Sequence, residues 1–176
     1  MRVITPDVGG GFGPKIFTYQ EYALVLLAAA RLNRPVKWVS DRGESLISDT
    51  QGRAQTCRAE LALDDTGRFL AMRFDCLSDM GAYPGQHGPN IATVAGDGLH
   101  PATYDLEAVH VRVRGVFTNT LPTDSYRGAG RPEVIYAVER LVDAAARELG
   151  FDPVDLRLRN FVPVSYTHLT LPTKRI

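Results

Sequence analysis

The sequence predicts an α+β fold in which helices pack against a mixed sheet. Residues 54–77 alternate apolar and polar side chains on either side of a turn, as a β-hairpin does. Residues 19–32 and 132–149 have the apolar spacing of helices, and each follows a loop preceded by a strand-like segment. Two strand–loop–helix units and a hairpin therefore favour layers of helix against sheet.

The first strand–loop–helix unit lies at the N-terminal end of the sequence. Val3 and Ile4 are expected to form a short strand that runs into the glycine segment Gly9–Gly13. The helix over 19–32 is expected to stop before Pro35. The next expected elements are a strand over 36–39 and a turn or short helix beginning over 41–44.

The hairpin brings the two cysteines of the chain together. A turn at 65–68 sets Cys57 opposite Cys76. Because free cysteine is commonly a core residue and the cytoplasm is reducing, we expect two buried free thiols, with a disulfide as the alternative. The sequence has no C-x-x-C pair, so cysteine alone cannot hold a zinc or iron–sulfur site here.

The second half of the sequence begins with a segment rich in structure breakers. Residues 78–102 contain eight glycines and prolines, so we expect a long loop there. A strand over 108–117, a loop over 118–131 and a helix over 132–149 should follow, and Asp152-Pro153 should cap a last helix over 154–160. The apolar stripe expected on the long helix consists of Val134, Val138, Leu141, Val142 and Ala145.

Residues 164–176 differ in character from the rest of the sequence. They combine threonines, branched residues, a proline and a basic end. This segment is similar to the translated adapter sequence found at the ends of some assembled environmental fragments, so we expect a non-native tail. A native polar strand is the alternative.

Composition and charge exclude several classes of function. Hydrophobic residues make up 44% of the chain and charged residues 23%, as in a globular domain. Twenty basic residues balance twenty acidic ones without long runs of one sign, so neither nucleic acid nor membrane is an expected partner. The sequence shows no signal peptide and no apolar run long enough to span a membrane. We expect a cytoplasmic protein that binds a small-molecule substrate or protein partners.

Two loops could carry chemistry. The first is Gly9-Gly10-Gly11-Phe12-Gly13, whose backbone amides could cradle an anion or a polar oxygen. It fits neither the dinucleotide fingerprint nor the phosphate loop, because Lys15 follows a proline and Ile16 replaces the hydroxyl ligand for magnesium. A tight structural turn is therefore an equal alternative for this segment alone.

The second loop is Ser125–Glu133, which precedes the long helix. Arg127 offers a planar fork suited to phosphate or a pterin carbonyl, and Gly128 and Gly130 let the backbone approach a ligand. A helix N-terminus also favours negative charge. Ordinary surface arginines are the alternative interpretation.

Together the loops resemble those of one enzyme family. A Gly-Gly-Gly-Phe-Gly-x-Lys segment followed about 115 residues later by Tyr-Arg-Gly-x-Gly-x-Pro is similar in order and spacing to the molybdopterin-binding large subunit of the xanthine dehydrogenase/aldehyde oxidase family. The resemblance covers residues 2–163 and implies an internal fragment with a partial molybdopterin-binding domain over 1–163. Further matching segments are Arg34–Glu44, Gly81–Tyr83, Thr118–Thr120 and Asp155–Asn160.

The resemblance implies a cofactor, partners and site residues. Phe12 and Gly13 would contact the ligands of the metal, with Gly11 beside them, and Arg127 with Gly128 would contact the molybdopterin. The cofactor would be molybdopterin, either alone or as the cytosine dinucleotide. The expected partners are the rest of the large subunit, an iron–sulfur subunit and an FAD subunit. The family hydroxylates a carbon with oxygen from water, and its general-base glutamate would lie beyond residue 176, so we expect the fragment alone to be inactive.

Departures from the family pattern bear on the substrate. Ile16 and Ala129 stand where purine-oxidising members carry a glutamate and a stacking phenylalanine, and their arginine would fall near Ala95, so we expect that xanthine is not oxidised. The cysteine of the carbon-monoxide-oxidising branch is absent after Arg127, as in its form II members. An aldehyde or an N-heterocycle is the expected substrate.

Other functions compatible with the sequence are a stand-alone nucleotide-binding module and a non-catalytic structural fragment. His87 and His100 lie in the long loop, but a lone loop histidine is usually not a ligand, and neither is assigned to the site. No residue of the chain is expected to bind the metal directly.

Overall fold

The computed structural model describes residues 2–94 and 99–163. The expected tail over 164–176 and Ala95 lie outside these residues. The chain divides into a first unit of residues 1–54, 78–95 and 115–130 and a second unit of residues 55–77, 96–114 and 131–176. Among the described residues, no helix has the length and apolar character needed to cross a membrane.

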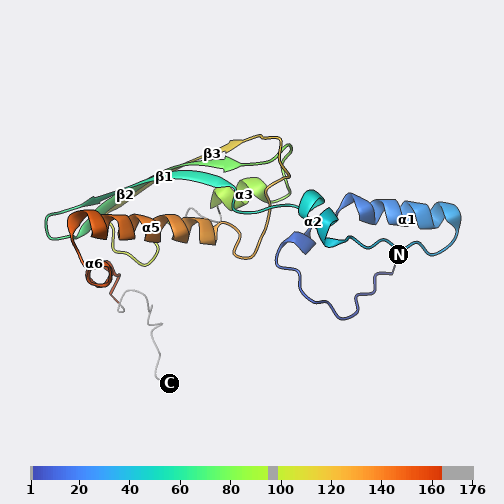
Figure 1. Cartoon of the computed structure of the whole chain (residues 1–176), viewed down its shortest axis with the longest axis horizontal. Helices are drawn as coiled ribbons and strands as arrows, with labels where there is room; N and C mark the ends of the chain where they lie inside the picture. The colour runs from blue at the N-terminus through green and yellow to red at the C-terminus, as the bar shows by residue number, and fades with distance from the viewer. Residues whose placement is uncertain (1, 95–98, 164–176) are drawn as a thin grey trace, which may run out of the picture. The chain divides into compact units, whose positions relative to one another are not determined.

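A three-stranded sheet forms the framework of the second unit (Figure 1). The hairpin strands β1 (Gln55–Leu63) and β2 (Phe69–Asp79) are antiparallel, and β3 (Ala108–Val116) lies beside β2. The Glu107 amide donates to the Leu70 carbonyl and the Met80 amide to the Val116 carbonyl, so β2 and β3 run parallel. The expected mixed sheet and α+β class are therefore confirmed.

The hairpin turn explains why β1 and β2 pair. Gly67 has a φ of 83°, which glycine adopts without steric cost. The Asp64 carboxylate accepts hydrogen bonds from the amides of Thr66 and Arg68, at 2.9 and 3.0 Å. These local bonds fix the turn predicted from the sequence.

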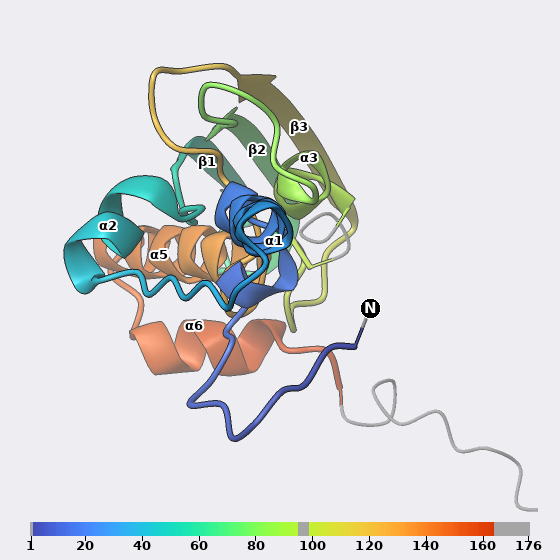
Figure 2. The same cartoon turned by 90° about the vertical axis from the view of Figure 1, so that its right-hand side faces the viewer.

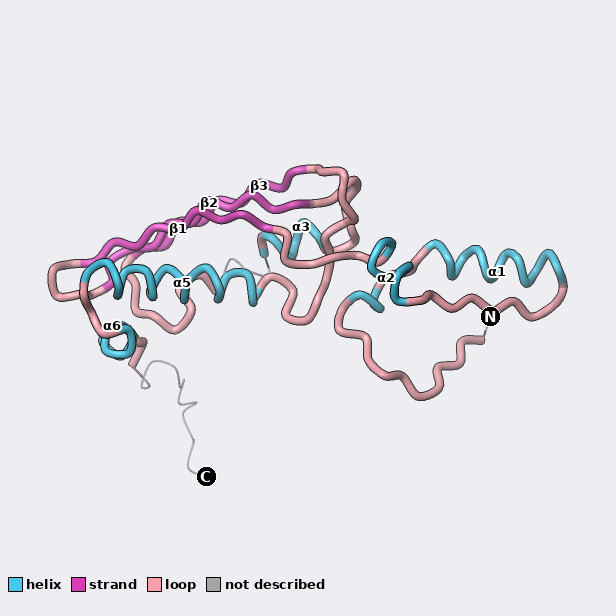
Figure 3. Tube along the Cα trace, in the orientation of Figure 1, coloured by secondary structure: helices cyan, strands magenta, loops and turns pink. Residues whose placement is uncertain are grey.

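Helix α5 (Arg131–Leu149) covers one face of this sheet, as Figure 3 shows. Its buried side chains repeat every four residues, which places them on one side of the helix. They pack with the inward side chains of β2, because alternate residues of a strand share a face. The residues that form this core include Phe69, Met72, Phe74, Val134, Val138, Val142 and Ala146. Leu141 and Ala145, also expected in the stripe, are partly buried against it.

The two cysteines form a disulfide in the structure. Cys57 and Cys76 lie opposite each other in the hairpin, with their Cα atoms 4.0 Å apart. The predicted register is correct, but the expectation of two free thiols is wrong. The reason is geometric: directly opposed residues of antiparallel strands bring their side chains close enough to bond.

Helix α6 (Pro153–Asn160) lies beside α5 (Figure 2) and begins at the predicted cap. The Asp152 carboxylate accepts hydrogen bonds from the amides of Val154 and Asp155, at 2.8 and 3.0 Å. At its other end, Asn160 is buried, accepts a hydrogen bond from the Phe69 amide and donates to the Gly67 carbonyl. The helix is therefore tied to the hairpin turn of the sheet.

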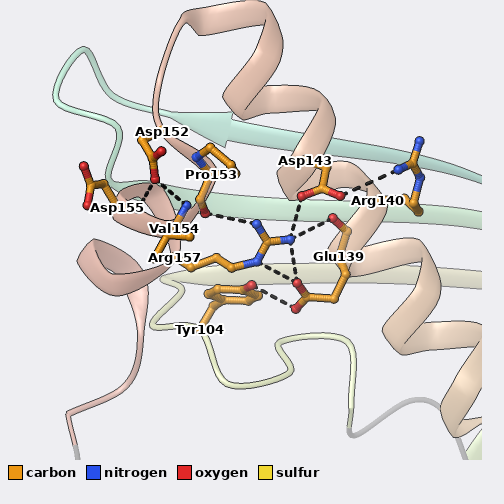
Figure 4. Close-up of polar contacts among 9 residues, drawn as sticks. All are labelled: Tyr104, Glu139, Arg140, Asp143, Asp152, Pro153, Val154, Asp155 and Arg157. Carbon is orange, nitrogen blue, oxygen red and sulfur yellow. Dashed lines mark hydrogen bonds and ion pairs between the residues drawn. The ribbon is translucent and has the colours of Figure 1, made fainter.

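A charged cluster joins α6 to α5 (Figure 4). The Arg157 guanidinium donates to the carboxylates of Glu139 and Asp143, at 2.9 and 2.8 Å. Glu139 also accepts a hydrogen bond from the Tyr104 hydroxyl at 2.8 Å. Burial, followed by the hydrogen bond to Glu139, raises the pKa of Tyr104 above its ordinary value. The phenol therefore stays protonated as a donor.

The first unit contains short helices and connecting loops. Its described helices are the 3-10 helix η1 (Pro14–Ile16), α1 (Gln20–Leu32), α2 (Arg42–Ser48) and α3 (Gly88–Ala92). α1 ends at Asn33, which takes the left-handed conformation common at helix ends. α2 begins with a capping box, because Asp41 and Glu44 each accept the other's backbone amide.

Two predicted strands are not formed. Residues 3–4 and 36–39 have no regular structure, because a strand needs a partner and neither segment pairs with another part of the described chain. Among its described residues, 78–94 and 99–102, the expected loop is mostly irregular, but it contains α3 and the end of β2. The strand over 108–117 and the three longer predicted helices are confirmed to within one or two residues.

Candidate cofactor-binding site

The glycine segment of the first unit forms a compact turn. Gly10 and Gly13 have φ values of 142° and 103°, and Phe12 has a φ of 52°. Positive φ is an outlier for a bulky residue such as phenylalanine, so the surrounding structure must hold this turn. The Ile16 amide donates to the Gly13 carbonyl at 2.9 Å, which closes η1 directly after the segment.

The second predicted loop is also built from left-handed backbone. Gly128, Ala129 and Gly130 have φ values of 97°, 40° and 90°. The Ala129 amide donates to the Tyr126 carbonyl at 2.7 Å, which closes a turn around Arg127. α5 starts at the next residue, Arg131.

The structure brings the two loops into direct contact. The Arg127 amide donates to the Phe12 carbonyl at 2.9 Å, and the Arg127 guanidinium carbon lies 5.8 Å from the centre of the Phe12 ring. A Cβ placed on Gly13 would lie 2.5 Å from the Ser125 carbonyl oxygen. Of the five predicted site residues, Phe12, Gly13 and Arg127 therefore form one cluster. Gly11 and Gly128 are their chain neighbours.

The cluster offers donors suited to an anionic, oxygen-rich group. Among the residues that the structure describes, no hydrogen bond from the amides of Gly11, Phe12 or Gly13 is found. Phe12 is 58% exposed, and Arg127 beside it is also exposed. Unpaired amides and a guanidinium together form the kind of cradle that binds phosphate or polar oxygen. The donor set therefore fits a molybdopterin.

A cleft lies beside this cluster. Its volume is about 640 Å³, and it reaches from Pro14, next to Gly13, to Tyr126, next to Arg127. Both polar and apolar side chains form its wall. The remaining lining residues are Ser40, Asp41, Arg42, Ser45, Leu46, Asp49, Thr50, Gln51, Gly52 and Arg53.

No direct metal site accompanies the cleft in the part of the chain that the structure describes. No group of three or more His, Cys, Asp or Glu side chains lies close enough to hold an ion there.

Two residues near the loops were missed by the sequence reasoning. Arg53 donates to the Arg127 carbonyl, and its guanidinium carbon lies 4.9 Å from the centre of the Tyr126 ring. Asp124 is 1% exposed and accepts hydrogen bonds from the amides of Ser125 and His87, at 2.6 and 3.1 Å. No sequence pattern marks either residue, although Asp124 lies directly before the Ser125 loop.

Two of the three positions used to predict the substrate, Ile16 and Ala129, lie in or near the two loops. Ile16 is 63% exposed at the end of η1, and Ala129 lies in the turn after Arg127. His87 lies in the first unit beside Phe17, with ring centres 5.8 Å apart. His100 is buried in the second unit against Phe74, with ring centres 4.7 Å apart.

Comparisons with known proteins place these loops in one family. Residues 1–161 match the molybdopterin cofactor-binding domain. The chain is 35% identical over 164 residues to the carbon monoxide dehydrogenase large chain of Hydrogenophaga pseudoflava, covering 92% of this chain and 20% of that protein. It is 34% identical over 160 residues to the xanthine dehydrogenase molybdenum-binding subunit of Escherichia coli O157:H7, covering 91% and 21%.

A solved structure agrees with the match. The chain superposes on quinoline 2-oxidoreductase from Pseudomonas putida 86 with a TM-score of 0.84 and 38% identity, covering 91% of this chain and 20% of that one. The chain thus spans about a fifth of the length of these proteins. It belongs to the molybdopterin cofactor-binding domain family of the large subunits of xanthine dehydrogenase/aldehyde oxidase-type enzymes.

Proposed function

We propose that the chain is part of the large subunit of a molybdenum hydroxylase that oxidises an aldehyde or an N-heterocycle in the cytoplasm. The observation that carries this proposal is the contact between the two loops, in which the Arg127 amide donates to the Phe12 carbonyl. When bound, the molybdenum cofactor supplies the redox centre at which a water-derived oxygen is added to the substrate.

The residues of this chain hold the cofactor rather than react. The amides of Phe12 and Gly13 donate hydrogen bonds to it, and Gly11 keeps the approach free of side chains. Arg127 provides a forked cation for its pterin or phosphate oxygens, and Gly128 lets the backbone close around it. The general base is supplied from elsewhere in the subunit.

The substrate proposal rests on what surrounds the loops. Ile16 and Ala129 provide neither a carboxylate nor an aromatic face, and a purine has polar edges that would remain without partners beside them. The similar quinoline 2-oxidoreductase is named for an N-heterocycle. An aldehyde or a heterocycle with few polar groups therefore suits this site better than xanthine does.

In this proposal, partner subunits carry electrons away from the molybdenum cofactor. The full subunit would assemble with an iron–sulfur subunit and an FAD subunit, and its molybdopterin would be bound either alone or as the cytosine dinucleotide. The relatives named as a large chain and a molybdenum-binding subunit support an assembly of several subunits.

Turnover of the complete enzyme in labelled water tests the activity. Benzaldehyde, quinoline and xanthine would be supplied separately to the assembled enzyme in H₂¹⁸O, and products analysed by mass spectrometry. We expect ¹⁸O in the product of the aldehyde or the heterocycle and no oxidation of xanthine. Incorporation of oxygen from O₂, or preferential oxidation of xanthine, would contradict the proposal.

A further inference from the structure

Arg53 has a backbone conformation that its own side chain does not favour. Its φ is 71°, in the left-handed region that glycine and asparagine visit more readily than arginine does. Such a conformation persists only where neighbouring structure holds it, and it is concentrated at ligand sites. The contacts around Arg53 therefore indicate the structural role of this backbone conformation.

The segment before Arg53 is fixed against the segment that leads to Arg127. The Gln51 amide donates to the Pro122 carbonyl at 3.0 Å, and the Asp124 amide donates to the Gln51 carbonyl at 2.8 Å. A Cβ on Gly52 would lie 2.9 Å from the Cβ of Tyr126, so the two backbones approach closely here. Arg53 thus starts from a backbone that is already aligned with the second loop.

The side chain of Arg53 then contacts two consecutive residues of that loop. One guanidinium nitrogen donates to the Arg127 carbonyl, and the guanidinium carbon lies 4.9 Å from the centre of the Tyr126 ring. A guanidinium can do both at once, because it combines a planar face with several N–H donors. A lysine ammonium has no such face and could replace only part of this arrangement.

These contacts hold the backbone of Arg127, the residue whose side chain faces Phe12. The Arg127 carbonyl is held by Arg53, while the Arg127 amide is held by the Phe12 carbonyl. With both ends of its backbone fixed, Arg127 has fewer orientations available to its side chain, which lowers the cost of ordering it on a ligand.

We propose that Arg53 is a positioning residue that braces the Tyr126–Gly128 turn and so presents Arg127 to the cofactor. The bracing follows from the geometry, and its effect on the cofactor rests on the proposed function of Arg127. Arg53 also lines the cleft beside the loops.

Two measurements on the full-length subunit test this proposal. The first is the rate at which trypsin cleaves after Arg127 in protein prepared without molybdenum, followed by mass spectrometry. The second is the molybdenum bound per subunit in protein prepared with molybdenum. The variants are Arg53→Ala, Arg53→Lys and Tyr126→Leu. Arg58→Ala is the control, because Arg58 pairs with Glu60 on an exposed surface.

We expect Arg53→Ala to speed cleavage after Arg127 by roughly tenfold, as for loss of one charge-assisted hydrogen bond, and to lower bound molybdenum. Arg53→Lys should lie between Arg53→Ala and the wild type, and Arg58→Ala should match the wild type. Because the two contacts share one guanidinium, the effects of Arg53→Ala and Tyr126→Leu should not add. On a logarithmic scale, the double variant should raise the cleavage rate by less than the sum of the two single effects. Unchanged circular dichroism would show that the variants fold.

Wild-type cleavage in Arg53→Ala and Tyr126→Leu would overturn the bracing role. If Arg127→Ala still lost molybdenum in that case, the proposed function would stand without it. If cleavage rises in Arg53→Ala but neither Arg53→Ala nor Arg127→Ala alters bound molybdenum, the bracing contact is supported and its role in cofactor binding is overturned.

Discussion

Gly13 and Gly9 differ in how much room the structure leaves them. A Cβ on Gly13 would lie 2.5 Å from the Ser125 carbonyl oxygen, and its φ of 103° is one that other residues rarely adopt. A Cβ on Gly9 would have no atom within 4 Å, and its φ is not in the left-handed region. The structure therefore requires glycine at position 13 but leaves room for a side chain at position 9.

Substituting these glycines tests whether loop contact matters for cofactor binding. In the full-length subunit, Gly13→Ala should lower bound molybdenum by roughly tenfold or more, because backbone strain of about 1–3 kcal/mol would separate the loops. Gly9→Ala should leave the content unchanged. Metal analysis of the two purified variants gives the answer, and equal molybdenum in both would count against the loop pair.

The sequence suggested some residues of the proposed site but not all of them. Phe12, Gly13 and Arg127 could be proposed because each lies in a recognisable segment at a characteristic spacing. Arg53 could not, because its role depends on a left-handed φ and on tertiary contacts with Tyr126 and Arg127. Neither feature leaves a pattern in a single sequence.

At the scale of helices and strands, predictions that rested on residues close together in the sequence were the more accurate. The capping residue Asp152 and the helical apolar spacing of α5 are properties of neighbouring residues, and helices α6 and α5 form where predicted. The strands expected over 3–4 and 36–39 failed, because a strand depends on a partner elsewhere. The disulfide was misjudged for another reason: the register was right, but compartment was used to decide its chemistry.

The charged cluster between α5 and α6 makes the stability of this pair depend on pH. The hydrogen bond from Arg157 is the main cause that lowers the pKa of Asp143 below its ordinary value of 3.8. A lowered carboxyl pKa in the folded state adds stability above the ordinary pKa, and this stability is lost as the pH falls through the lowered value.

Asp143→Asn should remove that contribution. We expect the thermal midpoint of the variant to lie a few degrees at most below that of the wild type at pH 6, since partly exposed ion pairs contribute modestly. The difference should shrink below pH 3.8. Thermal unfolding of the 176-residue chain across this range measures it, with Asp65→Asn in the exposed hairpin turn as the control. A difference that grows on acidification would refute the assignment.

At the scale of the whole molecule, the surface carries many large apolar side chains. None of the residues of α1 is buried, and Leu24 and Leu27 are 60% and 49% exposed. Exposed apolar patches of this kind commonly mark surfaces that another protein segment covers. The chain spans about a fifth of the length of its relatives, which is consistent with a cover supplied by the rest of a larger subunit.

The isolated 176-residue chain should therefore bind a hydrophobic dye such as ANS. We expect Leu24→Glu combined with Leu27→Glu to reduce the dye fluorescence, because the exposed apolar area of α1 falls. Gln20→Glu combined with Ala30→Glu adds the same charge to the same helix while sparing both leucines, and it should retain most of the signal. Equal fluorescence from the two double variants would show that α1 is not the binding surface.

The most direct test of the proposed site is a density map of the full-length subunit purified with its cofactor. We predict that the cofactor density touches the backbone of Phe12 and Gly13 and the guanidinium of Arg127, with Arg53 still holding the Arg127 carbonyl. Cofactor density that contacts neither loop would contradict the central claim that these two segments form the molybdopterin site.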